Sequence, residues 1–190
     1  MLQTFKKNIF SDTVDKRLLM LRNLFISFKI DGFIVPHNDK FFNEMTPANS
    51  CRLEWITGFS GSAGTAIIFK KKAALFTDGR YSIQIKLEVD QSKFSLINLA
   101  TSKPINWLEK EFNRETVIGF DPWLHSVSEI DRLTRKLSPL IKFKAVNNLI
   151  DVVWKDQPQQ TASFAYKRPN RLSGQTVAVK LEEVTRILKL

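Results

Sequence analysis

Apolar positions near the start of the chain follow first a helical and then a strand-like spacing. Between Ser11 and Phe28 apolar side chains recur every three or four residues, which predicts an amphipathic helix. Asp31-Gly32 ends this pattern, and residues 33–36 form a short apolar run that Pro36 stops, as expected of a strand. A helix that leads into a buried strand is typical of a layered α/β domain.

A β-hairpin is predicted around the densest cluster of positive charge. The apolar runs Thr65–Phe69 and Ala73–Thr77 flank Lys70-Lys71-Lys72, and adjacent lysines suit a solvated turn between two strands. Before the hairpin, Arg52–Thr57 has the apolar spacing of a short helix, which Gly58 is expected to end.

The rest of the first domain alternates between helical and strand-like segments. The predicted elements are a helix over 81–89, a strand over 94–99, a helix over 104–112, a strand over 117–120, a helix over 126–137, a strand over 143–146 and a helical turn over 147–154. Strands that alternate with helices predict one α/β domain, residues 1–154, with a mixed sheet and helices on both of its faces.

The residues after this domain differ in character. Residues 155–172 contain Gln157-Pro158 and Arg168-Pro169 and show little periodicity, so we predict an interdomain linker. Helical spacing returns within 173–190, from Val177 onward. A helix with one apolar face needs a partner to bury it, so this segment is expected to be the first helix of a truncated second domain.

Composition and charge narrow the class of protein. No apolar run reaches the roughly 18 residues of a membrane-spanning helix, and residues 1–10 lack the apolar core of a signal peptide, so a cytoplasmic protein without a membrane partner is expected. The net charge is +10, but residues 1–95 carry 14 Lys/Arg against 9 Asp/Glu and residues 96–190 carry 15 against 10. Because the excess is +5 in each half, no basic face is concentrated and no nucleic-acid partner is predicted.

The residue types that carry catalysis are sparse. Cys51 is the only cysteine, so neither an internal disulfide nor a cysteine-based zinc site can form, and we expect a half-buried thiol beside a helix start. The two histidines, His37 and His125, lie in separate predicted loops without HExxH-type spacing. No serine is selected as a nucleophile either, so no catalytic residue and no set of metal ligands is predicted.

Two segments beside predicted strands have unusual local chemistry. Residues 58–64 contain three glycines and two serines, but lack the lysine of a phosphate-binding loop and the spacing of a hydrolase elbow, so a tight turn is predicted. In Asp78-Gly79-Arg80-Tyr81, the aspartate can cap a helical turn and the arginine can pair with a carboxylate. Asp39 and Glu44 are its candidate partners, and the sequence does not choose between them.

Four blocks of sequence together resemble the amino-terminal domain of aminopeptidase P, a creatinase-type metallopeptidase. They are residues 52–66 (RLEWITGFSGSAGTA), 74–81 (ALFTDGRY), 118–126 (IGFDPWLHS) and 148–154 (NLIDVVW) followed by Gln157-Pro158. Leu172-Ser173-Gly174 further resembles the start of the second domain of that family. Because the blocks occur in the family's order, the resemblance covers essentially the whole chain.

The resemblance implies an RNase H-like, creatinase amino-terminal fold in an Xaa-Pro aminopeptidase, an enzyme that removes the first residue of peptides whose second residue is proline. In that family two divalent ions, usually manganese, are held by two Asp, one His and two Glu of a carboxyl-terminal domain. No position of this sequence matches those ligands. No cofactor is therefore expected in this chain, which should be inactive alone.

The expected contribution of the domain is restriction of substrate access and support of assembly. Loops at the ends of predicted strands supply the candidate residues for substrate access: His37, Asp39, Glu44, Arg52, Phe59, Ser60, Arg80 and Tyr81. Residues 36–45 depart from the family pattern at Lys40, Phe41 and Met45. The expected partners are the rest of the peptidase chain or a second subunit and, through the full enzyme, proline-containing peptides. The alternative is a freestanding module that binds a partner or forms a homodimer through the apolar face of 177–190.

Overall fold

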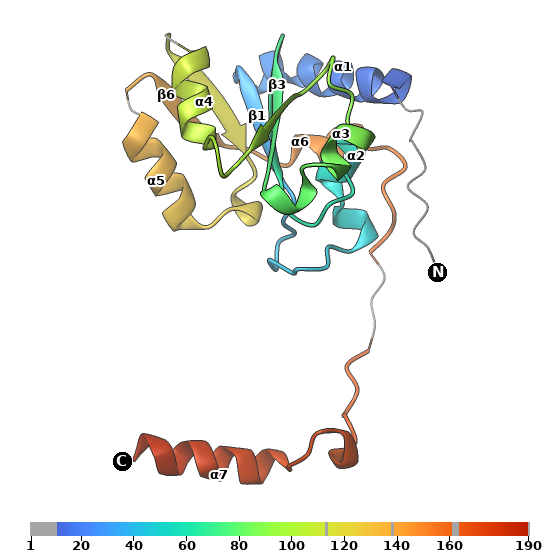
Figure 1. Cartoon of the computed structure of the whole chain (residues 1–190), viewed down its shortest axis with the longest axis vertical. Coiled ribbons are helices and arrows are strands. Elements are labelled where there is room, and N and C mark those ends of the chain that lie inside the picture. The colour runs from blue at the N-terminus through green and yellow to red at the C-terminus, as the bar shows by residue number, and fades with distance from the viewer. Residues whose placement is uncertain (1–10, 113, 138, 161–163, 190) are drawn as a thin grey trace. The chain divides into compact units, whose positions relative to one another are not determined.

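The computed structural model describes residues 11–112, 114–137, 139–160 and 164–189. Within these ranges six strands form one sheet in the spatial order β4-β3-β2-β1-β5-β6 (Figure 1). Their bounds are β1 Gly32–Pro36, β2 Thr65–Phe69, β3 Ala73–Thr77, β4 Ser95–Asn98, β5 Thr116–Phe120 and β6 Ile141–Ala145. β2 is antiparallel to β1 and to β3, whereas β3–β4, β1–β5 and β5–β6 are parallel. The predicted mixed sheet is confirmed.

The described ranges contain seven α-helices. They are α1 Ser11–Phe28, α2 Arg52–Thr57, α3 Gln84–Glu88, α4 Pro104–Glu111, α5 Val127–Leu137, α6 Leu149–Val153 and α7 Val177–Leu188. The bounds of α2 are those predicted, because Gly58 takes a left-handed conformation with φ of 79° and ends the helix. The β2–β3 hairpin also has its predicted bounds, with the lysine cluster exposed in the turn.

Most other elements differ from their predicted bounds by one or two residues at an end, and two predictions differ for a clear physical reason. Of the helix predicted over 81–89, only Gln84–Glu88 is α-helical, as α3, and Tyr81 instead ends a separate 3-10 turn, Gly79–Tyr81. This difference follows from Asp78, whose side chain accepts a backbone N–H and starts the earlier turn. The last strand begins at Ile141, earlier than predicted, because it pairs in parallel with the whole of β5.

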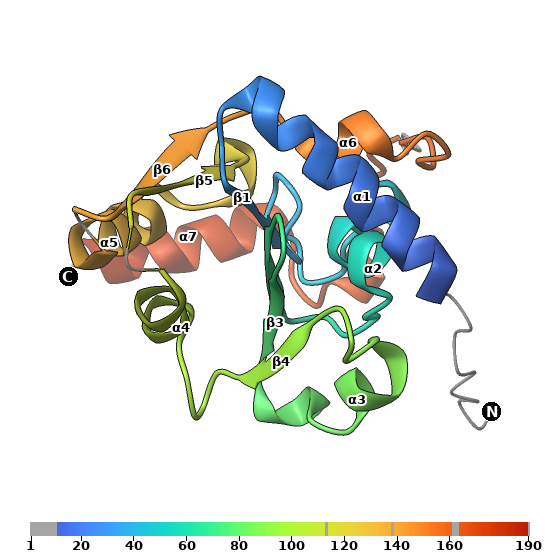
Figure 2. The ribbon, with the colours of Figure 1, turned by 90° about the horizontal axis from the view of Figure 1, so that it is seen from above.

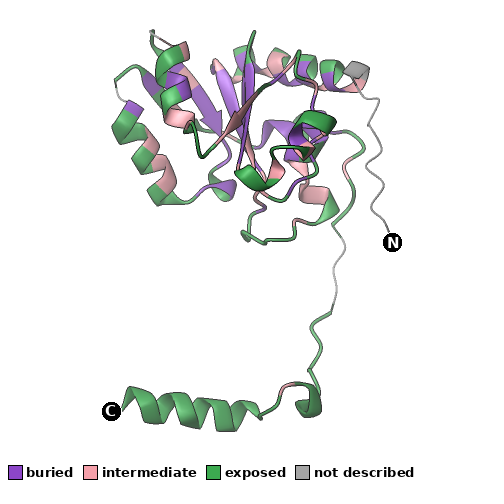
Figure 3. Cartoon of the chain, viewed as in Figure 1, coloured by how far each residue is buried: buried purple, intermediate pink, exposed green. Residues whose placement is uncertain are grey.

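Helices cover both faces of the sheet, as predicted (Figure 2). α1, α2 and α6 pack on one face, where Phe25 of α1 and Phe33 of β1 are fully buried. α4 and α5 cover the other face, where Trp107 of α4 packs in a second core cluster. Side chains alternate along β1, so that Phe33 and Val35 belong to the first core and Ile34 to the second. Figure 3 shows the buried sheet between these two helical layers.

The direction of the strands gathers the candidate loops at one edge of the sheet. Five strands run the same way and β2 alone runs against them, so the loops after β1, β3, β4, β5 and β6 share an edge with the loop before β2. This edge, called the carboxyl edge below, holds residues 37–46, 58–64 and 78–81. Open α/β sheets place their ligand sites at such an edge.

The described residues divide into two units between Pro158 and Gln159. The first contains the sheet with α1 to α6, and the second contains a 3-10 turn, Asn170–Leu172, and α7. The large apolar side chains of α7 are exposed, from 40% for Val179 to 80% for Leu188 (Figure 3). Among the helices of the described ranges, none has the length and apolar character that crossing a membrane requires.

Candidate functional site

The loop after β1 folds around the carboxylate of Asp39, which is 1% exposed. Its Oδ1 accepts the backbone N–H groups of Phe41 and Asn43, each at 3.0 Å, and its Oδ2 accepts Asn43 Nδ2 at 2.8 Å. Burial alone would raise the pKa of Asp39, but the hydrogen bonds from this loop outweigh burial and lower it. Asp39 is therefore a carboxylate that organises its own loop, and its oxygens are engaged inside that loop.

His37 closes the same loop at its base. Its backbone N–H donates to the Gly64 carbonyl at 2.9 Å, and its Nε2 lies 2.9 Å from Thr46 Oγ1. Burial lowers the pKa of His37, against the smaller opposing effects of a Glu44 backbone hydrogen bond and the charge of Asp39. His37 therefore joins the start of the loop to the residue before β2 and to Thr46 at the end of the loop.

The tip of this loop exposes apolar side chains. Phe41, Phe42 and Met45 are 66%, 51% and 83% exposed, and Glu44 is exposed beside them. Phe42 has a φ of 56°, which is uncommon for a bulky residue. The hydrogen bonds to Asp39 hold this conformation against the residue's own preference. An apolar tip on a fixed backbone is a feature of contact surfaces.

The glycine-rich loop before β2 is attached to Tyr81. The Tyr81 hydroxyl lies 2.6 Å from Ser62 Oγ and accepts the Ser62 N–H at 3.2 Å. Its ring meets Phe59 edge-on, with the ring centroids 5.5 Å apart. Phe59 is 1% exposed, so it supports the loop from inside. A Cβ atom on Gly61 would lie 2.2 Å from Phe59 Cζ, so the loop closes in this form only with glycine there.

Ser60 in the same loop is held by α3. Its backbone N–H donates to Glu88 Oε2 at 2.9 Å and its hydroxyl donates to Glu88 Oε1 at 2.8 Å. Gln84 Nε2 completes the network, with 2.9 Å to Ser60 Oγ and 3.0 Å to Glu88 Oε1. Gln84 and Glu88 are not among the candidate residues predicted from the sequence. Their four-residue spacing places them on one helix face, but nothing local indicates that this face meets Ser60.

Neither of the two candidate partners that the sequence left open for Arg80, Asp39 and Glu44, forms the ion pair. Arg80 pairs with Asp78, through Nε to Oδ1 at 3.0 Å and Nη2 to Oδ2 at 2.8 Å. The predicted cap is confirmed, because Asp78 also accepts the Arg80 backbone N–H at 3.0 Å. Asp78 is the main cause of the raised pKa of Arg80, and Glu44 contributes last. Arg80 is exposed and lies over the Tyr81 ring, 5.3 Å from its centroid.

Arg52 joins helices rather than loops. Its guanidinium donates to Asp151 of α6 through Nε at 2.7 Å and Nη2 at 2.9 Å. Gln157 Nε2 donates to Asp151 Oδ1 at 2.9 Å and to the Asn49 carbonyl at 2.8 Å. Arg52 is thus engaged with α6 and not with the other candidates, and Asp151 and Gln157 are partners that sequence reasoning missed.

Hydrogen bonds also connect neighbouring loops along the carboxyl edge. Asn38 Nδ2 donates to the Leu124 carbonyl at 3.3 Å and so links the loop after β1 to the loop after β5. Asn148 Nδ2 donates to Asp121 Oδ2 at 2.9 Å and links the segment after β6 to the same loop. Trp123, next to these contacts, is 74% exposed. The edge is therefore a connected surface with a few protruding aromatic side chains.

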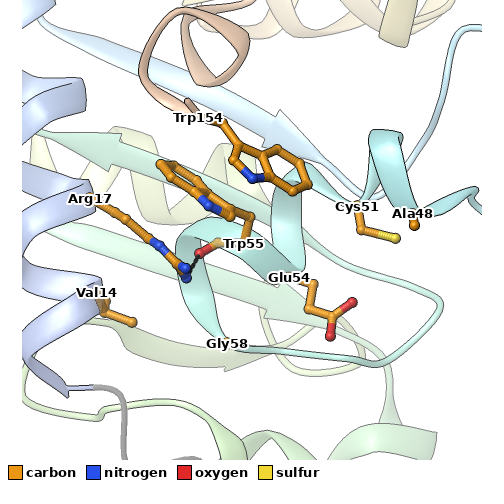
Figure 4. Close-up of a pocket in the computed structure, with 8 residues that line it drawn as sticks. All are labelled: Val14, Arg17, Ala48, Cys51, Glu54, Trp55, Gly58 and Trp154. Carbon is orange, nitrogen blue, oxygen red and sulfur yellow. Dashed lines mark hydrogen bonds between the residues drawn. The ribbon is translucent and has the colours of Figure 1, made fainter. Parts of the chain in front are cut away.

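A pocket of about 310 Å³ lies beside two stacked tryptophans (Figure 4). Trp55 and Trp154 have ring centroids 5.4 Å apart, and Arg17 donates to the Trp55 carbonyl at 2.6 Å. Cys51 lines the pocket as a half-buried residue immediately before α2, as predicted. Burial raises the pKa of the Cys51 thiol, which makes it a poor nucleophile.

The described residues do not fit a metal centre. In these ranges no three His, Cys, Asp or Glu side chains converge on one point. Nε2 of His37 faces Thr46, and Nδ1 of His125 lies 3.2 Å from a single carboxylate, that of Glu129. A dinuclear centre needs several converging carboxylates, and this arrangement does not provide them.

The sequence profile of the Creatinase/Prolidase N-terminal domain family matches residues 17–153. This chain belongs to that family. A curated relative, the probable Xaa-Pro aminopeptidase P of Aspergillus fumigatus, is 36% identical over 182 residues, which cover 92% of this chain and 27% of the relative. The chain thus spans less than a third of the length of the curated relatives it matches.

Solved structures agree with this assignment. The X-prolyl aminopeptidase of Caenorhabditis elegans, described as a cytosolic enzyme with a di-nuclear active site, matches with a TM-score of 0.80 and 26% identity. That match covers 93% of this chain and 31% of the worm protein. The creatinase/prolidase-like N-terminal domain of a protein from Corynebacterium diphtheriae has the same fold, with a TM-score of 0.55 at 22% identity over 73% of this chain and 98% of that one. The predicted family and fold are both confirmed.

Proposed function

We propose that this chain is the non-catalytic amino-terminal domain of an Xaa-Pro aminopeptidase, and that its carboxyl edge restricts the approach of peptides to an active site carried by another domain. The observation that carries the proposal is the loop of residues 37–46, whose exposed Phe41, Phe42 and Met45 project from a backbone fixed by the buried Asp39. A rigid apolar projection can exclude wide substrates and admit an extended peptide. The names of the relatives point to peptides with proline in second position.

The candidate residues divide into supports and contacts in this proposal. Phe59, Ser60 and Tyr81 hold the glycine-rich loop, and Asp39 and His37 hold the loop after β1. Arg52 fixes α2, from which the glycine-rich loop departs.

Arg80 and Glu44 are the exposed charged candidates, and both lie in carboxyl-edge loops. We assign them to direct contact with the peptide, with the Arg80 guanidinium able to attract a peptide carboxylate.

The remaining residues connect the domain to the rest of the enzyme in this proposal. Residues 155–172 serve as linker, and residues 173–190 supply the first helix of the second domain, whose bulk would cover the exposed apolar side chains of α7. Metal ions would be held entirely by that second domain. The worm enzyme is described as cytosolic, and we infer the same compartment for this protein.

A chimera tests the proposal. Residues 1–172 replace the equivalent segment of the C. elegans enzyme, and kcat/KM is measured for Xaa-Pro peptides from three residues upward. The double variant Phe41→Ser, Met45→Ser should alter kcat/KM for long peptides by about threefold or more and leave tripeptides unchanged. Ile26→Ser, at a 75% exposed position on α1, is the matched control and should change neither. An unaltered length profile in the double variant would reject the access role.

One observation favours a second candidate, self-association through α7. Leu181, Val184 and Ile187 of this helix are 61%, 53% and 64% exposed, which is a surface that a second copy of the chain could cover. Analytical ultracentrifugation at increasing protein concentration tests this self-association. A concentration-dependent dimer abolished by Leu181→Glu would support the homodimer, whereas a monomer at all concentrations would exclude it.

A further inference from the structure

A cavity of about 440 Å³ opens on the face of the sheet that α4 and α5 cover. Its floor is apolar, formed by Ile34 of β1 and Ile67 of β2, which are 3% and 2% exposed. Leu108 of α4 and Leu133 of α5 line it from the two helices. α4 and α5 lie on the same side of the central strands in Figure 2. The cavity is therefore a built feature of the helical layer, with walls from four different elements.

Positive charge surrounds this cavity. Lys103, Arg132 and Lys136 line it, and within the described ranges none of the three forms an ion pair. The lining contains one carboxylate, that of Glu129, and its Oε2 lies 3.2 Å from His125 Nδ1. This hydrogen bond is the main reason that the pKa of Glu129 is lowered. The cavity is therefore lined by three cationic side chains and by one carboxylate that is already hydrogen-bonded, so its lining carries a net positive charge.

The cavity also lies where an α/β sheet is expected to bind a ligand. It is lined by Leu99, just after β4, and by Pro104, at the start of α4, so it opens at the carboxyl edge. The order in which strands are added to the sheet reverses at β1: β2, β3 and β4 lie on one side of it, and β5 and β6 lie on the other. Crevices at such switch points are common ligand sites. The first turn of α4 has no side-chain cap, which suits a nearby anion.

We propose that this cavity binds a small organic carboxylate with an apolar body. The apolar part would lie over Ile34 and Ile67, and the carboxylate would meet Lys103, Arg132 and Lys136. The volume falls within the range of small-molecule sites, and the sign of the charge selects an anion over a neutral or cationic ligand of the same shape. A medium-chain fatty carboxylate and the carboxyl end of an apolar peptide share this chemistry.

The test is a titration of octanoate into the 190-residue chain, monitored by the backbone amide NMR signals of Thr65, Leu99 and Ile105. Octanol and octylamine have the same apolar body without the negative charge. Octanoate should give saturable shifts and bind about tenfold more tightly than octanol. N-acetyl-Leu-Leu and its amide form the peptide arm. Tighter binding of this peptide acid than of octanoate would identify peptide ends as the source, and the reverse order would identify fatty carboxylates.

Variants of α5 decide whether the cavity is the site. Arg132→Gln combined with Lys136→Gln should weaken octanoate binding about tenfold. Arg135→Gln removes a charge from the same helix outside the cavity lining and should leave the affinity unchanged. Equal affinities for octanoate and octanol, or unchanged octanoate binding in the double variant, would overturn the proposal. Because no peptidase activity is measured, this outcome is independent of the chimera experiment.

Discussion

Arg52 and Asp151, 99 positions apart, form a two-bond fork with distances of 2.7 Å and 2.9 Å. The Arg52 side chain is 13% exposed and the Asp151 side chain is 36% exposed, so the pair is partly shielded from water. It joins α2 to α6, and the glycine-rich loop departs from the end of α2. The helix that supports one candidate loop is thus held by a contact with α6, near the end of the first unit.

A double-mutant cycle on Arg52→Ala and Asp151→Ala should give a coupling free energy of about 1–2 kcal/mol, because the fork is bidentate and half-shielded. Urea unfolding of the four proteins measures it. Lys142 and Glu115 form an exposed ion pair, with side chains 62% and 65% exposed, and provide the control. Their coupling should stay below about 0.5 kcal/mol. Equal coupling free energies for the two pairs would show that the Arg52–Asp151 ion pair stabilises the domain no more than an exposed ion pair does.

Replacing Gly61 by alanine should destabilise the domain by about 1–3 kcal/mol, because the new Cβ would lie 2.2 Å from Phe59 Cζ inside a closed loop. Chemical denaturation measures the loss. Gly79→Ala is the control, since the nearest heavy atom to a Cβ there is 3.9 Å away and the change should be within about 0.5 kcal/mol. Phe59→Leu should partly restore stability in the Gly61→Ala background, and a neutral Gly61→Ala would contradict the observed packing.

Replacing Glu88 by alanine should free the glycine-rich loop, because Ser60 loses acceptors for both its N–H and its hydroxyl. The Ser60 amide should then exchange with deuterium about tenfold faster, as the loss of one charge-assisted hydrogen bond implies. The control is the amide of Asn43, which donates to Asp39 in another loop and should keep its rate. Unchanged exchange at Ser60 would mean that α3 does not hold the loop.

Asp39 should make the stability of the domain depend on pH. Its pKa is lowered on folding, so its contribution is present above the unfolded value of about 3.9 and is lost as pH falls through the folded value. The difference in unfolding free energy between the native protein and Asp39→Asn should therefore be greatest near neutral pH and shrink below about pH 4. Asp131→Asn on the exposed face of α5 is the control. A pH-independent difference for Asp39→Asn would contradict the lowered pKa.

The bounds of an element were predictable from the sequence where a residue at its end sets them. Gly58 ends α2 where the glycine stands, and the lysine cluster places the turn between β2 and β3. β6 was less predictable, because its first residue, Ile141, is fixed by pairing with Thr116 and not by its own sequence. The helix predicted over 81–89 begins too early, because its apolar spacing includes Tyr81. In the structure Tyr81 belongs to the 3-10 turn that Asp78 caps.

The candidate site was predictable in its position but not in its pairings. Loops that follow strands could be named from the strand pattern, and the structure gathers them at one edge. The partners of Ser60 and Arg52 lie 28 and 99 residues away, which no local pattern indicates. Arg80 shows the opposite case, since its partner, Asp78, is two residues away and both candidate partners left open by the sequence are more distant.

The most direct measurement is a titration of the purified chain with manganese by calorimetry, followed by an assay with an Xaa-Pro peptide in the same buffer. We expect neither saturable manganese binding nor release of the amino-terminal residue, because no ligand cluster exists in the described ranges. Saturable binding of manganese accompanied by peptide turnover would contradict this expectation.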